Sequence, residues 1–328
     1  MWREDAGISI FDLPIFYRDF PEMLHDPLSD VLQLVQATSV ISTGLKASGD
    51  WAVSVDSHSG FKFNAIMEGS CLLSVDGEDT VDLTAGDCFL LTKGLPFVIA
   101  SGDNQAPRPA REVFAGATGH LANFDGGPGK PFLCLGGRMG TTSDFDFLSS
   151  SLPPVVILRA AGMEAERVRW LLGRLVEEFD EGQPGAGVMA NQIMHMIFIE
   201  MIRYCKTLCP NDTNWLAAIS DRRIRPALEM MHGQAKNALR LDDLASACNL
   251  SRSQFSSRFV ALVGIAPMDY FLRWRMQLAK RALAAPGCRV AQIAADFGYQ
   301  SEAAFGAAFK RIHGVSPRRA VALPHADH

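Results

Sequence analysis

The chain has 328 residues, of which 48% are hydrophobic and 20% are charged, and its formal net charge is −5. This length supplies at least two ordinary hydrophobic cores, and the composition excludes a disordered chain. The start of the chain is acidic, unlike a signal peptide, and no stretch reaches the roughly 18 uninterrupted apolar residues of a membrane helix. Seven cysteines without a Cys-x-x-Cys pair argue against a disulfide framework or a zinc ribbon. We therefore expect a cytoplasmic protein with no membrane partner.

Residues 51–100 have the pattern of β-structure. Short alternating apolar runs are separated there by turn signals, which are Ser59-Gly60, Glu68-Gly69, Asp76-Gly77, Ala85-Gly86-Asp87 and Lys93-Gly94-Leu95-Pro96. Regular spacing of this kind is typical of an antiparallel sandwich or barrel and not of α/β units. We expect residues 1–160 to form this β-domain.

Two helices are predicted within residues 161–214. Glu164 to Glu181 is amphipathic, and a Gly-Gln-Pro-Gly break separates it from Val188 to Thr207. The second helix has apolar residues around nearly its whole circumference, which is typical of a buried helix. Its partner is either a second subunit, which would make the protein a homodimer, or the β-domain of the same chain. Residues 210–214 follow as a candidate hinge.

The C-terminal part contains one pattern twice. The first copy has Leu241, Leu244, Ala245, Ser251, Phe255, Phe259, Gly264 and Pro267, and the second has Val290, Ile293, Ala294, Ser301, Phe305, Phe309, Gly314 and Pro317. Each copy predicts a short helix, a turn, and a second helix that a serine opens and a glycine closes. This is the pattern of a helix-turn-helix, at residues 241–264 and 290–314.

The second helix of each copy has a recognisable start. Ser251 can cap its helix while Gln254 completes a capping box, whereas Ser301 caps its helix without one. Between the copies, Met268 to Ala284 predicts a single helix, which at about 1.5 Å per residue is about 25 Å long. Such a strut can hold two reading helices roughly one DNA turn apart, about 34 Å, so that both reach successive major grooves.

Charge separates the two ends of the chain. Residues 221–328 contain 16 Lys and Arg against 8 Asp and Glu, a net of +8, and residues 1–220 have a net of −13. A basic C-terminal part supplies the attraction to phosphates that dominates nucleic-acid affinity, whereas the acidic part would be repelled. Double-stranded DNA is therefore the expected partner, and we expect residues 215–328 alone to bind it.

The second copy and its tail contain a distinctive set of residues: Ile293-Ala294, Gly298-Tyr299, Ser301-Glu302, Phe305, Phe309-Lys310-Arg311 and Gly314-Val315-Ser316-Pro317. With these, residues 215–319 resemble the DNA-binding domain of the AraC/XylS family of transcriptional regulators. Through Glu68-Gly69, Gly86-Asp87, Leu90-Leu91 and Gly94-Leu95-Pro96, the β-domain resembles the cupin-like sensor domain found ahead of that DNA-binding domain. Asp26 to Leu32 and Leu152 to Val155 look like the ends of the cupin module.

The resemblance implies an α+β multidomain fold. An N-terminal antiparallel β cupin-like barrel at 1–160 would be followed by linker or dimerisation helices at 161–214 and an all-α tandem helix-turn-helix domain at 215–328. It also implies a sequence-specific transcriptional regulator that a small organic effector in the barrel controls. RNA polymerase would be a further partner if the protein is an activator. We expect no catalytic activity and no cofactor.

Helix geometry and the docking mode of the family give the expected DNA contacts. These are Arg252, Ser253, Ser256, Ser257 and Arg258 in the first reading helix, and Ala303, Gly306, Ala307, Lys310 and Arg311 in the second. Serine pairs with several bases, and arginine reaches guanine or a phosphate. Alanine can only meet a thymine methyl group, so the second helix is expected to position the protein on phosphates more than it specifies bases.

Cupins often hold a metal through histidines, but Asn64 and Phe97 stand where the resemblance would place two of them. His58 lies on a nearby loop and is expected to be a surface histidine, and His120 and His195 have no ligand-spaced partners. Because iron, copper and zinc prefer imidazole ligands, we expect no metal site. An amide and aromatic rings suit an organic ligand instead. The candidate effector residues are Trp51, Phe61, Phe63, Asn64, Phe89 and Phe97. The alternative is that these aromatics simply fill a closed barrel.

Two alternative functions stay open. Cys71, Cys88 and Cys134 fall within the predicted barrel, and Cys205 and Cys209 lie near Lys206 at a helix end. Since a thiolate beside a cation can be reactive, a redox-sensing regulator of the same family is the first alternative. Cysteine is also among the most buried residue types, which favours inert core cysteines. The second alternative is an effector-independent DNA-binding adaptor whose barrel serves only to dimerise.

Overall fold

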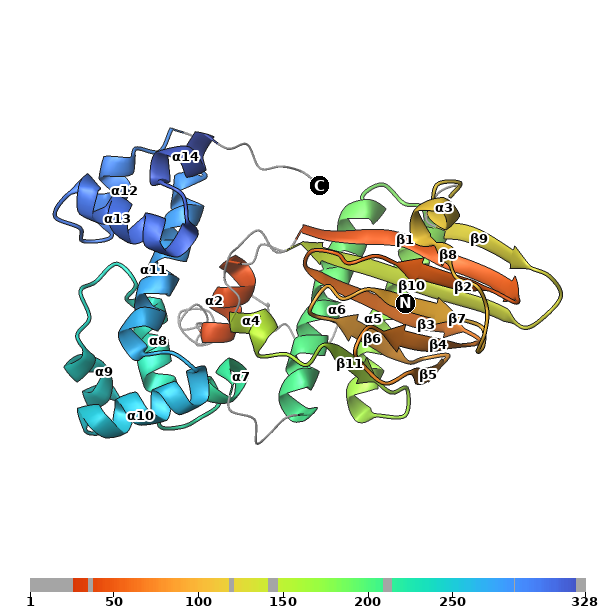
Figure 1. Ribbon diagram of the computed structural model, residues 1–328, viewed down its shortest axis with the longest axis horizontal. Coiled ribbons are helices and arrows are strands. Elements are labelled where there is room, and N and C mark those ends of the chain that lie inside the picture. Colours follow the sequence, from red (N-terminus) through yellow and green to blue (C-terminus); the bar gives the residue numbers. More distant parts are fainter. Residues whose placement is uncertain are drawn as a thin grey trace, which may run out of the picture. The chain divides into compact units, whose positions relative to one another are not determined.

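The computed structural model describes residues 26–34, 38–117, 121–140, 147–208, 214–285 and 287–322. These residues belong to two compact units, whose elements are labelled in Figure 1. One unit contains the described residues from 38 to 217, and the other combines helix α2 (Pro27–Leu34) with residues 218–322. The candidate hinge at residues 210–214 falls outside the described residues except for its last residue. In the described part of the chain, every helix is too short or too polar to traverse a bilayer.

The first unit is built from two sheets. Its described strands are β1 (Thr38–Gly49), β2 (Ala52–Val55), β3 (Phe61–Glu68), β4 (Ser70–Val75), β5 (Val81–Thr84), β6 (Cys88–Leu91), β7 (Phe97–Ala100), β8 (Arg108–Pro109), β9 (Leu121–Gly126), β10 (Pro131–Gly140) and β11 (Val155–Leu158). Among these, a six-stranded sheet has the order β11-β6-β3-β10-β1-β9 and a five-stranded sheet has the order β5-β4-β7-β2-β8. Apart from β1 with β9 and β2 with β8, the paired strands are antiparallel. The prediction of an antiparallel β-domain is confirmed.

The core of this unit lies between the two sheets. Leu45, Trp51, Leu73 and Phe132 are among its buried side chains, and the Trp51 and Phe132 rings lie 4.4 Å apart between centroids. Alternate residues of each strand point to opposite faces, so one face of each sheet supplies this core. Burial of such aromatic and aliphatic side chains is the main stabilising contribution to a sandwich of this kind.

Helices flank the six-stranded sheet. Helix α5 (Met163–Glu181) packs on α6 (Ala186–Leu208), and α6 packs on β1 and β11. The short helices of this unit are α3 (Ala110–Phe114), α4 (Phe147–Ser150) and α7 (Trp215–Ala218). Ile193, Ile197 and Phe198 of α6 are buried. Of the two partners expected for the apolar helix, the β-domain of the same chain therefore takes up much of its surface.

The second unit is all-helical. Its helices are α8 (Arg225–Gly233), α9 (Leu241–Ala247), α10 (Arg252–Val263), α11 (Pro267–Leu283), α12 (Val290–Asp296), α13 (Glu302–His313) and α14 (Pro317–Ala322). Helices α9 and α10 form the first helix-turn-helix and α12 and α13 form the second, as predicted. The predicted strut is α11, displaced by one residue from the expected bounds.

Helix α2 belongs to the second unit, where it packs on α8 and α11. The Asp30 carboxylate lies 3.2 Å from His232 Nδ1, and His232 Nε2 lies 2.7 Å from the Tyr270 hydroxyl. The His232 ring also stacks on Trp274 at 3.9 Å between centroids. The division at residue 160 assigned this helix to the sensor domain, whereas its contacts join it to the helices that carry the DNA-binding motifs.

Candidate nucleic-acid interface and sensor interior

The first reading helix, α10, begins and ends at the predicted residues. Ser251 Oγ accepts a hydrogen bond from the Gln254 amide at 3.3 Å, and the Gln254 side chain accepts one from the Ser251 amide at 3.2 Å. This is the predicted capping box. Gly264 ends the helix at φ +82°, a left-handed conformation that glycine adopts without strain. Phe255 and Phe259 are fully buried, which determines the face that α10 presents to solvent.

The outward face of α10 contains the predicted contact residues. Arg252, Ser253, Ser257 and Arg258 are exposed, and Ser256 is half-buried. Both arginines already have partners within the chain. Arg252 Nε lies 2.9 Å from Asp242 Oδ1, at the surface, where such a pair contributes little to stability. A DNA phosphate can therefore displace the Asp242 carboxylate at small cost.

Arg258 is held more firmly. Its Nε donates to Asp221 Oδ1 at 3.2 Å, and a second guanidinium nitrogen donates to Asp221 Oδ2. Burial alone would raise the pKa of Asp221, but the hydrogen bonds from Arg258 and from two backbone amides outweigh burial and lower that pKa. The carboxylate thus stays ionised and ties α10 to the segment before α8. This bidentate pair must compete with any contact between Arg258 and DNA.

The second reading helix, α13, repeats the arrangement with smaller side chains. Ser301 Oγ accepts a hydrogen bond from the Ala304 amide at 3.1 Å, without a capping box, as predicted. Phe305 and Phe309 are fully buried. Ala303, Ala307, Lys310 and Arg311 are exposed, and Gly306 is half-buried. A Cβ at Gly306 would lie 4.0 Å from Pro317 Cδ, so this position borders the start of α14.

Arg275 of α11 is a structural residue that the sequence analysis did not single out. Its guanidinium lies 5.4 Å from the Phe271 ring centroid and 5.5 Å from that of Tyr299, and it donates to the Phe297 carbonyl in the turn between α12 and α13. Burial lowers the pKa of Arg275. Arg275 therefore fixes the strut to the turn of the second motif. In the sequence, the spacing of Arg275 from Phe271 places it on the same face of the helix as this aromatic residue, and this spacing could have indicated its structural role.

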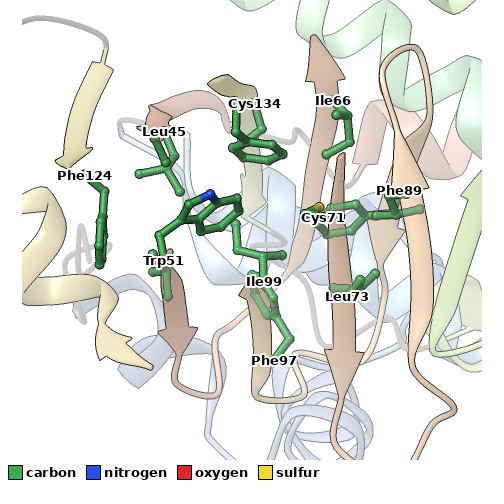
Figure 2. Packing of buried hydrophobic residues seen from close by; sticks show 14 of the residues in the cluster. Leu45, Trp51, Ile66, Cys71, Leu73, Phe89, Phe97, Ile99, Phe124 and Cys134 are labelled. Atoms are coloured by element: carbon green, nitrogen blue, oxygen red, sulfur yellow. The ribbon is translucent and has the colours of Figure 1, made fainter. Parts of the chain in front are cut away.

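In the first unit, three candidate effector residues come together. Trp51, Phe89 and Phe97 belong to the cluster between the sheets, where Figure 2 shows their side chains turned toward one another. The Phe97 ring stands edge-on to Phe89, with the centroids 6.2 Å apart. The other labelled members of the cluster in that view are Leu45, Ile66, Cys71, Leu73, Ile99, Phe124 and Cys134.

Strand β3 divides the remaining candidates between its two faces. The Phe61 ring packs on Phe198 of α6 at 5.1 Å between centroids, and Phe63 shares that face because it is two residues further along the strand. Asn64 has the opposite orientation and is paired with Phe89, a residue of the interior cluster. Phe61 and Phe63 thus pack beneath α6, so an interior effector site has to rely on Trp51, Asn64, Phe89 and Phe97.

An exposed groove lies on the outer side of α5 and α6. Its volume is about 750 Å³, and its lining comprises Glu166, Arg167, Trp170, Leu171, Met196, Ile199, Glu200 and Arg203. The Trp170 side chain is 66% exposed, which is unusual for the largest apolar residue. Acidic and basic side chains both border this apolar surface, and Arg203 pairs with Glu200 at 2.8 Å.

Comparison of the sequence with known proteins identifies the family to which the chain belongs. Residues 26–206 match the family described as Cupin, and residues 244–322 match the family described as Helix-turn-helix domain. A putative AraC-like transcription regulator of Streptomyces antibioticus is 37% identical over 294 residues, which cover 89% of this chain and 97% of that relative. The chain belongs to the AraC family of transcription regulators.

The chain is also similar to other proteins. The HTH-type transcriptional regulator AlkR of Acinetobacter baylyi is 25% identical over 305 residues, which cover 89% of this chain and 98% of AlkR. Among solved structures, ToxT of Vibrio cholerae with a bound unsaturated fatty acid aligns with 12% identity and a TM-score of 0.35, covering 87% of this chain and 95% of ToxT. The protein is a DNA-binding transcription regulator and not an enzyme.

A metal site in the first unit would need several ligating side chains close together. Within the ranges that the structure describes, His, Cys, Asp and Glu side chains form no group of three or more that could hold a metal ion. Asn64 and Phe97, which stand at the two histidine positions noted in the sequence, are buried. Neither side chain suits iron, copper or zinc.

The barrel cysteines lie in apolar surroundings. Burial raises the pKa of Cys71 and of Cys88 to about 12 and that of Cys134 to about 11. Since the thiolate is the reactive form, these three side chains are poor nucleophiles near neutral pH. Cys205 is also buried, and Cys209 falls outside the described residues.

Proposed function

We propose that α10 and α13 read two successive major grooves of an operator and that an organic effector inside the β-sandwich controls this binding. The observation that carries the DNA part is the repeated construction of the two helices. Each has a serine cap, two buried phenylalanines that fix its orientation, and an exposed face in a part of the chain with a net charge of +8. Phosphate attraction and groove insertion both follow from this arrangement.

The two helices are proposed to have different roles, with α10 recognising bases and α13 contacting phosphates. Ser256 and Ser257 of α10 offer hydroxyl groups to base edges, whereas Ala303 and Ala307 of α13 offer only methyl groups. Lys310, at the exposed end of α13, is suited to a phosphate. We expect Ser257→Ala to relax base preference in one half-site by about 1–3 kcal/mol. Lys310→Ala should weaken binding to all sequences alike. Selection of bound sequences from a random duplex pool measures both effects.

Val260→Ala provides a control within α10, because Val260 is also exposed but is not one of the expected DNA contacts. We expect only a small change in base preference for this variant. If Lys310→Ala altered base preference while Ser257→Ala did not, the roles assigned to the two helices would be reversed.

An effector in the sandwich is supported by buried aromatic rings beside the Asn64 amide, whose Nδ2 atom has no hydrogen-bond partner in the described part of the chain. Apolar walls with one orienting polar group are typical of small-molecule sites. The first step is to map bound genomic fragments and then to screen metabolites of the neighbouring genes for an increase in melting temperature. With the effector identified, Phe97→Ala should impair the response while DNA binding without effector persists, since Phe97 lies in the other unit.

The redox alternative is tested by a variant that lacks the three cysteines of the sandwich and retains Phe97. A chain with Cys71, Cys88 and Cys134 all changed to serine should still respond to the effector if circular dichroism shows that it folds, because their burial disfavours thiolate chemistry. Phe97→Leu keeps an apolar side chain and serves as the control for packing. Loss of the response in the folded triple variant, with a normal response in Phe97→Ala, would favour the redox alternative.

We also propose that the groove on α5 and α6 contacts a second copy of the chain. Trp170 and Met196 offer an exposed apolar surface that two copies could bury against each other across a twofold axis. Arg167 and Arg203 both pair with Glu200 within the chain and border this surface. Sedimentation equilibrium of the full chain and of Trp170→Glu measures this association. RNA polymerase is a further partner only if the regulator is an activator.

A further inference from the structure

A group of polar side chains lies inside the β-sandwich where β3 begins. Lys62 and Asn64 are two residues apart on β3, and they pair with Leu91 and Phe89 of β6. Both partners belong to the hydrophobic cluster between the sheets. Residues opposite each other on neighbouring antiparallel strands share a face of the sheet. Lys62 and Asn64 therefore point into the sandwich and not toward α6.

Strand β10 adds a second cation on the same face. Arg138 lies opposite Lys62 in the register of β10 with β3, and Gly136 lies opposite Asn64. Because Gly136 has no side chain, it does not cover the Asn64 amide from β10. Two basic side chains thus lie side by side at an edge of an apolar interior.

The loop before β3 contributes His58. Its amide donates to the Gly94 carbonyl at 3.0 Å, and its ring stands edge-on to Phe97 at 6.3 Å between centroids. Gly94 has φ +65°, and a Cβ there would lie 2.0 Å from the His58 carbonyl oxygen, so only glycine allows this close approach. The backbone therefore fixes the imidazole beside the aromatic wall.

Three polar atoms of His58 and Asn64 have no partner among the residues that the structure describes. Both ring nitrogens of His58 and Nδ2 of Asn64 are buried without a hydrogen bond, and Asn64 is only 7% exposed. Lys62 forms no ion pair with any carboxylate in the described part of the chain. Buried polar groups are normally satisfied, so unpartnered groups that lie together indicate a missing ligand.

The charges of the surrounding side chains indicate the sign of the charge on that ligand. Burial lowers the pKa of Lys62, and the Arg138 guanidinium lowers it further against an opposing effect of Cys134. Burial also lowers the pKa of His58, and the charge of Lys62 adds to this effect, so the imidazole is neutral near pH 7. Lys62 is thus a desolvated cation beside the Arg138 guanidinium, and a bound anion would stabilise its charged form.

We propose that His58, Lys62, Asn64 and Arg138 bind the carboxylate of an organic acid, an inference that rests on the proposed effector site in the same sandwich. Lys62 and Arg138 supply the charge, and the Asn64 amide and the His58 ring supply hydrogen-bond donors. Phe97 lies next to the site and packs against the apolar body of the ligand. Because the group consists almost entirely of donors, it suits a monocarboxylate and not a sugar, whose hydroxyls also need acceptors.

The test uses three acids and their matched primary amides on the full chain: benzoate with benzamide, phenylacetate with phenylacetamide, and octanoate with octanamide. Melting temperature and titration calorimetry are measured for each compound. We expect at least one acid to bind about 10-fold to 100-fold more tightly than its amide, the range of a hydrogen bond to a charged group. Lys62→Met should abolish this preference while it raises the melting temperature of the ligand-free chain, because it removes a desolvated cation.

Lys46→Met is the matched control, since Lys46 is an exposed residue of β1 in the same sheet. This variant should bind the acids as the original chain does. The proposal is overturned if no acid binds, if the amides bind as tightly as the acids, or if Lys62→Met retains the preference.

Failure of this inference can be distinguished from failure of the proposed function by measuring duplex DNA binding in the same preparations. If DNA is bound but the sandwich takes only neutral compounds, whose binding Phe97→Ala weakens, the anion site is wrong and the effector-controlled regulator stands. If DNA is bound and no compound enters the sandwich, the effector part of the proposed function fails together with the anion site. If the chain does not bind DNA, the DNA part of the proposed function fails whatever the acids do.

Discussion

Replacement of Phe309 with alanine is expected to lower the free energy of unfolding of the DNA-binding unit by about 3–5 kcal/mol. The Phe309 ring is fully buried and lies 5.7 Å from the Phe305 ring and 4.4 Å from the His313 ring, measured between centroids. It belongs to the hydrophobic cluster that includes residues of α11, α12 and α13. Alanine would leave a cavity at the centre of the second helix-turn-helix. Urea denaturation followed by circular dichroism measures the loss.

Two further variants serve as controls, one that retains most of the buried volume and one at an exposed position of the same helix. Phe309→Leu retains most of the buried volume, so we expect a clearly smaller loss. Arg311→Ala changes an exposed residue on the same helix, and we expect its effect on unfolding to stay within about 0.5 kcal/mol. A loss below about 1 kcal/mol for Phe309→Ala would contradict the packing of α13 described here. DNA footprinting of the same variant should show weakened protection in one half-site.

The helix-turn-helix motifs could be predicted closely because the signals that form them are local. The capping box of Ser251 with Gln254 and the left-handed Gly264 act within a few residues of the helix ends that they define. Phe255 and Phe259 lie one helical turn apart, so the sequence also determines which face is buried. The position of α11 between the motifs followed for the same reason.

The sandwich was predictable as β-structure but not in the orientation of each side chain. Strand β3 is covered by the interior cluster on one face and by α6 on the other, so apolar residues occur on both faces and the alternation is lost. Phe61 and Phe63 were therefore expected to share a site with Asn64, whereas they lie on the opposite face. Lys62 was overlooked because a lysine in a predicted strand is usually a solvent-facing residue.

Contacts between distant parts of the sequence gave no local signal. The Asp30 carboxylate meets His232 across 202 positions of the chain, and Asp221 meets Arg258 across 37 positions. Neither pair belongs to a periodic pattern, since each depends on the packing of complete helices. Helix α2 could thus be seen in the sequence only as a leading segment of the cupin module, and its place among the DNA-binding helices needed the structure.

The second large effect expected is the dependence of DNA affinity on salt. Each phosphate that a basic side chain neutralises should add roughly 0.9 to the slope of log K against log salt concentration, because condensed counterions are released. Residues 221–328 carry a net charge of +8, and Lys310 and Arg311 are exposed at the end of α13. We therefore expect a steep slope, with a loss of roughly 0.9 when Lys310 is replaced by alanine.

Salt titration of duplex binding by the full chain, followed by fluorescence anisotropy, tests the central claim most directly. The full chain is preferred to residues 215–328 because α2 packs on α8 and α11 and would be missing from that fragment. Lys46→Ala, at an exposed lysine of the sensor unit, is the control and should leave the slope unchanged. The account predicts affinity that falls linearly with log salt and a shallower slope for Lys310→Ala. A slope near zero for the original chain would contradict DNA binding by these helices.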